Sequence, residues 1–127
     1  MKITINLVTL VAKEVLVEFS TSVGFATAVW RAAPPKVGDQ YDVEFEVEDE
    51  FVWGGNAYSS LNCAHSIEVA DGIVTMTGTL ISNDMEGGAV VDVGGAIILI
   101  ELIGCAEVDS VFVDLKVKNM NVYPTGI

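Results

Sequence analysis

The chain has 127 residues, enough for one domain with its own hydrophobic core. Hydrophobic residues make up 51% of it and charged residues 19%, which excludes an intrinsically disordered chain. Eighteen acidic residues against six basic ones give a formal charge of −12, which argues against binding to nucleic acid or to an anionic membrane surface.

The first eleven residues predict a strand. Ile3, Ile5 and Leu7 alternate with polar residues, as in a half-buried strand. An export signal is the minor alternative, because polar side chains interrupt the apolar stretch and no small-residue cleavage site follows. With two cysteines in the chain, too few for a disulfide scaffold, we expect a cytoplasmic protein in which Cys63 and Cys105 are reduced and buried.

The rest of the chain keeps a period of two and has no convincing helical period. A loop with two prolines at 31–39 and the turn Asp71-Gly72 separate strands. Strands are predicted at residues 1–11, 15–19, 25–30, 41–47, 67–69, 74–80, 90–93, 97–103, 111–117 and 120–123. The pattern predicts one all-β domain over 1–127, either a small barrel or a compact antiparallel β-sandwich of about eight to ten short strands. Gly24 and Gly78 fall inside strands and predict bulges or close backbone approach.

Residues 97–103 are apolar on both faces, unlike the other strands. One face holds Ile98, Ile100 and Leu102, and the other holds Ile97, Leu99 and Ile103. Such a strand is covered on both sides, and we predict a homodimer interface at Ile98, Ile100 and Leu102. Glu101 lies on the same face as Ile97, Leu99 and Ile103. A buried carboxylate at this position would mark a functional site. Because Glu101 lies near the end of the strand, contact of its side chain with water is the favoured alternative.

Seven carboxylates lie between residues 39 and 50. Strand geometry places four of them in one row at a spacing of ~7 Å, here named the acidic ladder: Asp42, Glu44, Glu46 and Glu48. The ladder fits a solvated strand face, or a docking surface that steers a basic protein. A metal cluster is a weaker alternative, because carboxylates on a flat strand diverge. A neighbouring strand with Lys116 and Lys118 is expected to relieve part of the repulsion.

An aromatic loop follows the ladder directly. Aromatic residues beside Gly54 and Gly55 are typical of recognition loops, although Phe51 and Trp53 are equally suited to plug one end of a barrel. The predicted partner-binding residues are Asp42, Glu44, Glu46, Glu48, Asp49, Glu50, Phe51, Trp53 and Tyr58.

Cys63 and His65 share a strand face, as two metal ligands or a nucleophile and its base would. Zinc needs two further soft or nitrogen ligands, and Cys105 is the only other cysteine. A nucleophile pair lacks an evident third orienting group. We therefore predict no metal site, no cofactor and no catalytic residue, and a structural or exposed role for His65; the chain is not expected to be an enzyme.

Residues 37–47 read VGDQYDVEFEV, a glycine-anchored turn that leads from the proline-containing loop into an alternating strand. This stretch resembles small OB-like β-barrel domains of bacteria. The resemblance implies a closed or half-open barrel of about five or six strands with extra strands at one end. OB-like domains often bind oligonucleotides through basic, aromatic faces, whereas this stretch is acidic, so the resemblance assigns no functional residue.

Acidity, small size and the aromatic loop predict a protein-binding domain that engages a basic protein surface. Its most specific form is an immunity- or antitoxin-type inhibitor that occludes a basic active site. Two alternatives stay open. One is a structural or accessory subunit that associates with itself, and the other is a small-ligand carrier or enzyme whose internal pocket uses Glu101, His65 or Trp53.

Overall fold

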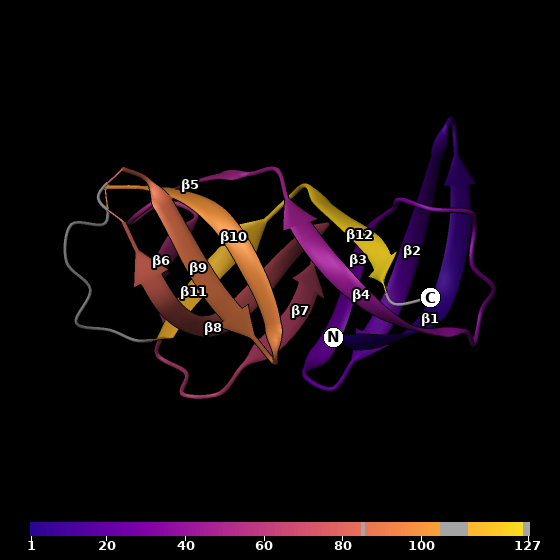
Figure 1. Ribbon diagram of the computed structural model, residues 1–127, viewed down its shortest axis with the longest axis horizontal. Coiled ribbons are helices and arrows are strands. Elements are labelled where there is room, and N and C mark those ends of the chain that lie inside the picture. Colours follow the sequence, from indigo (N-terminus) through magenta and orange to yellow (C-terminus); the bar gives the residue numbers. More distant parts are fainter. Residues whose placement is uncertain (85, 105–111, 126–127) are drawn as a thin grey trace.

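The computed structural model describes residues 1–84, 86–104 and 112–125, which form twelve strands and no helix (Figure 1). The strands are β1 (Lys2–Val11), β2 (Glu14–Thr21), β3 (Gly24–Trp30), β4 (Gln40–Val47), β5 (Glu50–Val52), β6 (Ala57–Ser59), β7 (Ser66–Ala70), β8 (Ile73–Asn83), β9 (Gly88–Val93), β10 (Ala96–Ile103), β11 (Phe112–Val117) and β12 (Met120–Thr125). The all-β prediction is confirmed, with more strands than expected.

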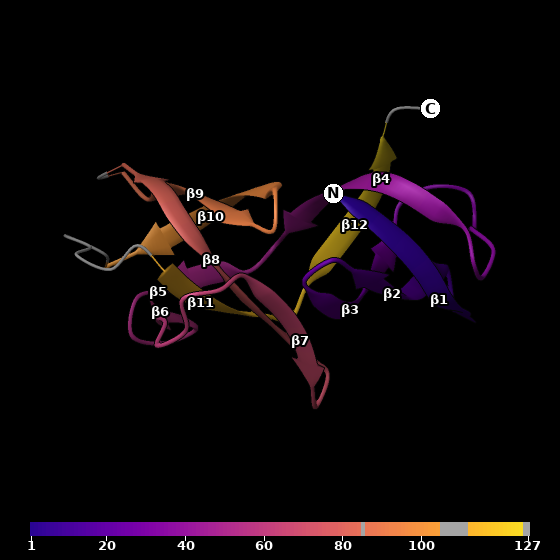
Figure 2. The ribbon, with the colours of Figure 1, turned by 90° about the horizontal axis from the view of Figure 1, so that it is seen from below.

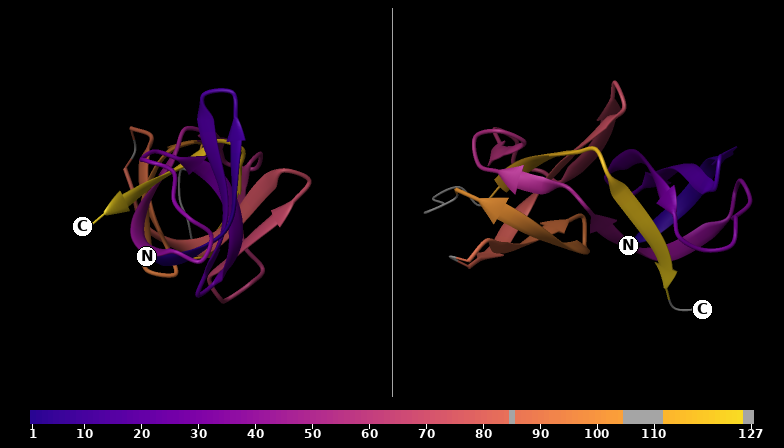
Figure 3. Two further views of the ribbon diagram at one scale, coloured as in Figure 1. Left: turned by 90° about the vertical axis from the view of Figure 1, so that its right-hand side faces the viewer. Right: turned by 90° about the horizontal axis from the view of Figure 1, so that it is seen from above.

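Five strands, β1, β2, β3, β4 and β12, close into a barrel (Figure 3). Antiparallel pairs join β4 to β1, β1 to β2 and β2 to β3. The last strand, β12, completes the ring by pairing antiparallel with β4 and parallel with β3. Phe19 and Phe45 stack inside it with ring centroids 5.7 Å apart, and both are buried. The expected closed barrel is therefore present.

The remaining strands, β5–β11, form what we name the distal sheet, which the chain inserts between β4 and β12 (Figure 1). Its strands pair in the order β5–β10–β9–β8–β11–β6. The β7–β8 hairpin connects this sheet to the barrel, because Gly24 of β3 pairs with Ile67 of β7. Buried side chains of the barrel and of the distal sheet belong to one hydrophobic core.

Two hairpins of the distal sheet turn on residues with positive φ. Asp71 and Gly72 have φ angles of 53° and 75°, and Gly94 and Gly95 have 60° and 97°. Two-residue turns of this kind match the right-handed twist of the strands they join. The Asp71-Gly72 hairpin is thus confirmed.

The prediction that Ile98, Ile100 and Leu102 of β10 form a dimer interface is wrong. Ile98, Ile100 and Leu102 are 0%, 6% and 4% exposed and lie in the core of this same chain, so they cannot form a dimer interface. The opposite face is the open one, with Leu99 71% exposed and Ile97 56% exposed. The pairing of β10 with β9 decides the orientation, because it turns the three buried residues to the side where Val91 and Val93 are buried.

Residues 51–60, predicted as a loop, contain two short strands. Glu50–Val52 pairs in parallel with residues 101–103 of β10, and Ala57–Ser59 pairs with β11. These partners lie about fifty residues away along the chain, so no local pattern indicates them.

The prediction that Cys63 is buried is wrong, because its side chain is exposed. Cys105 lies outside the described residues. No helix in the described part of the chain is long and apolar enough to cross a membrane.

Candidate partner-binding site

The acidic ladder lies on the outer face of β4. All four ladder carboxylates are exposed, while Val43 and Phe45, which alternate with them, are 3% and 7% exposed. This arrangement follows from the period of two, since apolar residues on one side of β4 line the barrel and carboxylates occupy the other. The carboxylates therefore form one continuous acidic row.

The protein's own cations leave the ladder unneutralised. Among the described residues, none of the six Lys and Arg side chains forms an ion pair with a ladder carboxylate. The prediction that Lys116 reduces the repulsion between the ladder carboxylates is wrong. Its strand, β11, pairs with β6 and β8, and the Lys116 ammonium donates to Thr75 Oγ1 at 2.9 Å. Lys2 lies opposite Asp42 in the register of β1 and β4, so one end of the ladder has a basic neighbour.

Two of the predicted partner-binding residues have structural roles instead. The Asp49 carboxylate accepts the backbone N–H groups of Lys118 and Asn119 at 2.9 and 2.8 Å, and so holds the turn between β11 and β12. Phe51 is 0% exposed and part of the core, so it cannot touch a partner. The burial of Phe51 corrects its assignment, whereas the assignment of Asp49 to the partner surface stays a prediction.

The other two aromatic residues do not join the ladder. Trp53 is half-buried and packs against the core, and Tyr58 lies half-buried on β6, which pairs with β11. Phe51 and Trp53 therefore pack on the hydrophobic core. Phe51 lies in β5 and Trp53 directly after it, so they belong to the distal sheet and do not plug the five-stranded barrel. Glu50 is exposed and continues the acidic row beyond Asp49.

Beside the ladder, β4 and β10 lie next to each other without hydrogen bonds between them. We call the gap between residues 45–47 of β4 and residues 97–99 of β10 the seam. Figure 2 shows β10 beginning near the end of β4. The chain passes from β4 into β5, which does pair with β10 from Glu101 onward, so the seam is closed at that end and open at the other.

Two hollows follow the seam and meet at Leu99. The larger has a volume of about 640 Å³ and the smaller about 380 Å³. Their walls combine carboxylates of the acidic row with exposed apolar side chains: Glu44, Glu46, Glu48, Glu50, Glu101, Ile97, Leu99 and Tyr123. No Lys or Arg is among the described residues that line either hollow.

Sequence reasoning missed the apolar half of this site. It named the ladder, yet Ile97, Leu99 and Tyr123 lie beside it only because the fold places β10 and β12 next to β4. The one available signal was the two-faced apolar pattern of residues 97–103, which indicated that a surface of this strand needed a cover.

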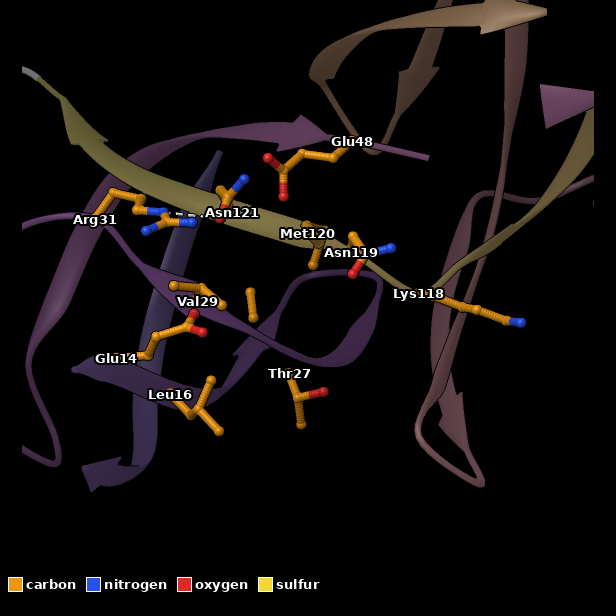
Figure 4. Close-up of a pocket in the computed structure, with 11 residues that line it drawn as sticks. Glu14, Leu16, Thr27, Val29, Arg31, Glu48, Lys118, Asn119, Met120 and Asn121 are labelled. Carbon is orange, nitrogen blue, oxygen red and sulfur yellow. Dashed lines mark hydrogen bonds between the residues drawn. The ribbon is translucent and has the colours of Figure 1, made fainter. Parts of the chain in front are cut away.

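A third hollow, of about 360 Å³, lies on the barrel between β2, β3 and β12 (Figure 4). Arg31 donates from Nε to Asn121 Oδ1 at 2.8 Å, and the buried Asn121 donates in turn to Glu46 Oε1 at 3.2 Å. Glu48 also lines this hollow, and Lys118 points away from it in Figure 4. Glu46 is therefore bound to the barrel, whereas no such contact constrains Glu44 or Glu48.

His65 has a structural role, as expected. Its Nδ1 accepts the backbone N–H of Gly94 at 2.8 Å, so the ring proton is on Nε2, which lies 2.7 Å from Thr79 Oγ1. Both ring nitrogens are therefore occupied. Groups of three or more side chains able to hold a metal ion are absent from the described part of the chain.

The fold perturbs the ionisation of Tyr41, at the start of the ladder strand. Desolvation raises the pKa of its phenol above the ordinary value of 10.0, and a hydrogen bond to Asp39 and the charge of that carboxylate raise it further. The hydroxyl donates to Asp39 Oδ2 at 3.1 Å, and the ring meets Trp30 edge-on at 4.9 Å. Tyr41 therefore fixes the loop before β4 and is not part of the acidic row.

Comparisons of the chain with protein-family models, with curated proteins and with solved structures find no match. The function is therefore inferred from the geometry of the ladder and the seam.

Proposed function

We propose that this protein is an acidic protein-binding domain that receives a basic surface of another protein at the ladder and the seam. The observation that carries the proposal is the combination of an unneutralised acidic row with exposed Ile97 and Leu99 in the same pair of hollows. Carboxylates attract and orient a cationic partner, and apolar contacts hold it once water is displaced.

In its specific form the protein is an immunity- or antitoxin-type inhibitor that covers a basic active site. Small size and a net charge of −12 support this form. The order of the barrel ring, with one parallel pair between β3 and β12, supports an OB-like barrel whose usual basic face has been replaced by an acidic one. The exposed thiol of Cys63 suits a reducing compartment, and we place the protein in the cytoplasm.

Self-association is the second candidate, and the exposed face of β10 supports it. The dimer interface would then consist of Ile97, Leu99 and Ile103, because Ile98, Ile100 and Leu102 are buried. Two copies meeting at this face would bring two acidic rows together, which disfavours the arrangement. Light scattering separates the candidates, since a dimer through this face would dissociate when Leu99 is changed to Asp.

A small-ligand carrier is the third candidate. The hollow between β2, β3 and β12 supports it, because Arg31 offers positive charge there (Figure 4). Glu14 and Glu48 line the same hollow and offset that charge. The ladder supports a binding role more strongly, since none of the described Lys and Arg side chains forms an ion pair with its carboxylates.

The test of the proposal compares two charge reversals. The double variant Glu44→Lys with Glu48→Lys changes ladder residues whose side chains form no hydrogen bond or ion pair with the rest of the described chain. The matched control, Glu18→Lys with Glu68→Lys, makes the same change in net charge at exposed residues of β2 and β7.

The probe is the peptide Arg-Ala-Arg-Ala-Arg-Ala, measured by calorimetry at low salt and again at raised salt. We expect the ladder variant to lose at least about tenfold in affinity and the control less than about threefold, because close charges contribute more than distant, screened ones. Equal losses in the two variants would mean that only net charge matters, and would contradict the proposal.

A further inference from the structure

We propose that a second copy of this chain pairs with the outer edge of β1, in an antiparallel arrangement whose twofold axis passes through Thr9. We call residues 7–11, on the side of β1 that faces away from β2, the β1 edge. The β1–β2 hairpin carries this edge past the end of the barrel (Figure 1). The β1 edge is not part of the ladder or the seam, so a dimer formed there goes beyond the proposed function.

The β1 edge becomes free after Ile5. Strand β4 pairs with β1 only at residues 2–4. The N–H of Ile5 donates to the Asp39 carbonyl at 2.9 Å, and its C=O accepts the N–H of Gly38 at 2.8 Å. A β-bulge follows between Ile5 and Leu7. Beyond the bulge, no described residue forms a backbone hydrogen bond with β1 on this side.

Val8 and Leu10 hold the unpaired backbone groups of the β1 edge. The two-residue turn at 12–13 makes the residues that flank it a hydrogen-bonded pair, and bonded pairs alternate with non-bonded ones along the hairpin. Leu10 and Val8 are therefore not bonded to β2, and their N–H and C=O groups point outward. The next hairpin agrees, because the same alternation from its turn at 22–23 directs Val17, opposite Val8, to β3.

Antiparallel pairing with a second copy satisfies all of these groups in one register. With the twofold axis at Thr9, Val8 of each copy lies opposite Leu10 of the other, and each such pair exchanges both of its hydrogen bonds. An axis at Val8 or at Leu10 would pair that residue with itself and leave the other one unpaired. The β1 edge is therefore self-complementary, as a twofold interface requires.

The side chains of the β1 edge also match across this axis. Leu7, Leu10 and Val11 are 48%, 69% and 50% exposed. In the register centred on Thr9, Leu7 lies opposite Val11 of the other copy, and the two threonines form a favourable cross-strand pair. Pairing would therefore remove apolar surface from water on both copies.

The β1 edge lacks the features that usually keep free edges apart. Lysine, proline and inward-pointing charges are the common ones, and residues 6–12, which read NLVTLVA, contain none of them. An edge of this kind pairs with another strand unless something covers it. A basic segment would find no carboxylate within these residues, so charge gives it no preference for this edge.

The carboxylates closest to the β1 edge in the hairpin lie on β2. Glu14 pairs with Val11 and Glu18 with Leu7. In the dimer, Glu18 of one copy and Glu14 of the other are three strand spacings apart, about 14 Å, which exceeds the Debye length of about 8 Å at physiological salt. A second copy therefore meets no close like charge here, whereas the exposed face of β10 would bring two acidic rows together.

The first test is sedimentation of the chain from about 10 µM to about 1 mM, the range in which a small interface dissociates. We expect monomer at the low end and dimer at the high end. Raised salt should strengthen the dimer, because it screens the repulsion between two chains of net charge −12. Binding of a basic peptide to the ladder should weaken with salt, so failure of one interaction is distinguishable from failure of the other. A chain that stays monomeric at about 1 mM and raised salt would overturn the inference.

The second test places charge on the twofold axis. Thr9 is exposed, so Thr9→Lys and Thr9→Glu leave the core unchanged. Each variant brings two like charges directly opposite each other and should dimerise at least about threefold more weakly than the original chain. An equimolar mixture of the two variants should recover the dimer, because lysine then lies opposite glutamate.

The matched controls are Ser59→Lys and Ser59→Glu, which make the same charge changes at an exposed residue of β6. Neither control nor their mixture should change dimerisation by more than about twofold. If the mixed Thr9 variants dimerise no better than each variant alone, the axis does not pass through Thr9. A dimer that is lost in Leu99→Asp and kept in both Thr9 variants would belong to β10. Either result would overturn the inference.

Amide hydrogen exchange by NMR tests the backbone pairing. Val8 and Leu10 should exchange at least about fivefold more slowly at about 1 mM than at about 50 µM, because their N–H groups gain partners in the dimer. Leu7 and Thr9 are bonded to β2 in either state and should change less than about twofold. Equal protection of Val8 and Leu10 at both concentrations would mean that the chain itself covers this edge. That result, or a dimer without slower exchange at these two residues, would rule out strand pairing between copies.

Discussion

Tyr41 shows how a single side chain at the start of the ladder strand is held by the acidic surroundings. Its hydroxyl donates to Asp39, and its ring packs on Trp30. Removing the phenolic proton would leave two anions in contact, which is why both effects of Asp39 act in the same direction as desolvation. The neutral phenol is therefore part of the folded structure of this loop.

We predict that the phenol of Tyr41 titrates late. The pKa of Tyr41 is raised in the folded protein, so stability from this group is fully present below the ordinary value of 10.0 and is lost as the pH rises through the folded pKa. Ultraviolet titration should show a late-titrating phenol that disappears in Tyr41→Phe and moves to lower pH in Asp39→Asn. A late phenol that persists in Tyr41→Phe would assign the effect to another residue.

At the scale of the element, β5 shows how a three-residue strand can anchor a long insertion. It places Phe51 in the core and directs Val52, 50% exposed, to solvent. Its parallel pairing with β10 also closes one end of the seam. Loss of this strand would free the end of β4 and change the shape of both hollows.

We predict opposite outcomes for two adjacent substitutions in β5. Phe51→Ala should lower the free energy of unfolding by about 3–5 kcal/mol, because it leaves a cavity in the core. Val52→Ala, at an exposed position, should change it by less than about 0.5 kcal/mol. Urea unfolding measures both, and a similar small loss in the two variants would show that β5 does not hold the core.

The strands differ in how far the sequence determines them. Alternation in β4 assigned Val43 and Phe45 to the interior without ambiguity, since the other face is fully charged. In β10 both faces are mostly apolar, so the pattern could not choose between them, and the pairing with β9 made the choice.

The ladder could be predicted for the same reason, whereas the seam could not. The seam is a property of three strands whose residues lie far apart in the sequence, and no local pattern records that β4 lies beside β10 without pairing while β5 pairs with β10. The sequence also could not decide whether Phe51 is buried or contacts a partner, because an aromatic residue beside glycines is compatible with either role.

At the scale of the whole molecule, Gly24 joins the barrel to the distal sheet. It pairs with Ile67 at a φ of +147°, and a Cβ atom at this position would lie 1.8 Å from the Ile67 carbonyl oxygen. The expected close approach of the backbone at Gly24 is thus confirmed. A similar approach occurs at Gly78, where a Cβ would meet the carbonyl oxygen of Asp92 at 2.4 Å.

We predict that Gly24→Ala lowers the free energy of unfolding by about 2–4 kcal/mol, because the backbone of β7 must move to admit the methyl group. Gly55→Ala is the control, with its nearest contact at 3.3 Å, and should change stability by less than about 1 kcal/mol. Thermal unfolding measures both. A Gly24→Ala protein as stable as the control would show that the barrel and the distal sheet tolerate separation at this point.

The position of β12 has a consequence for synthesis on the ribosome. Strands β3 and β4 both pair with β12, which is synthesised some seventy residues after β4 ends. The barrel therefore stays open while strands β5–β11 emerge. During that interval the nascent chain exposes the unpaired edges of β3 and β4, which can associate with other chains. Contacts of such long sequence separation also form slowly. Abundant negative charge, which keeps neighbouring nascent chains apart, would then protect the protein before it has any partner to meet.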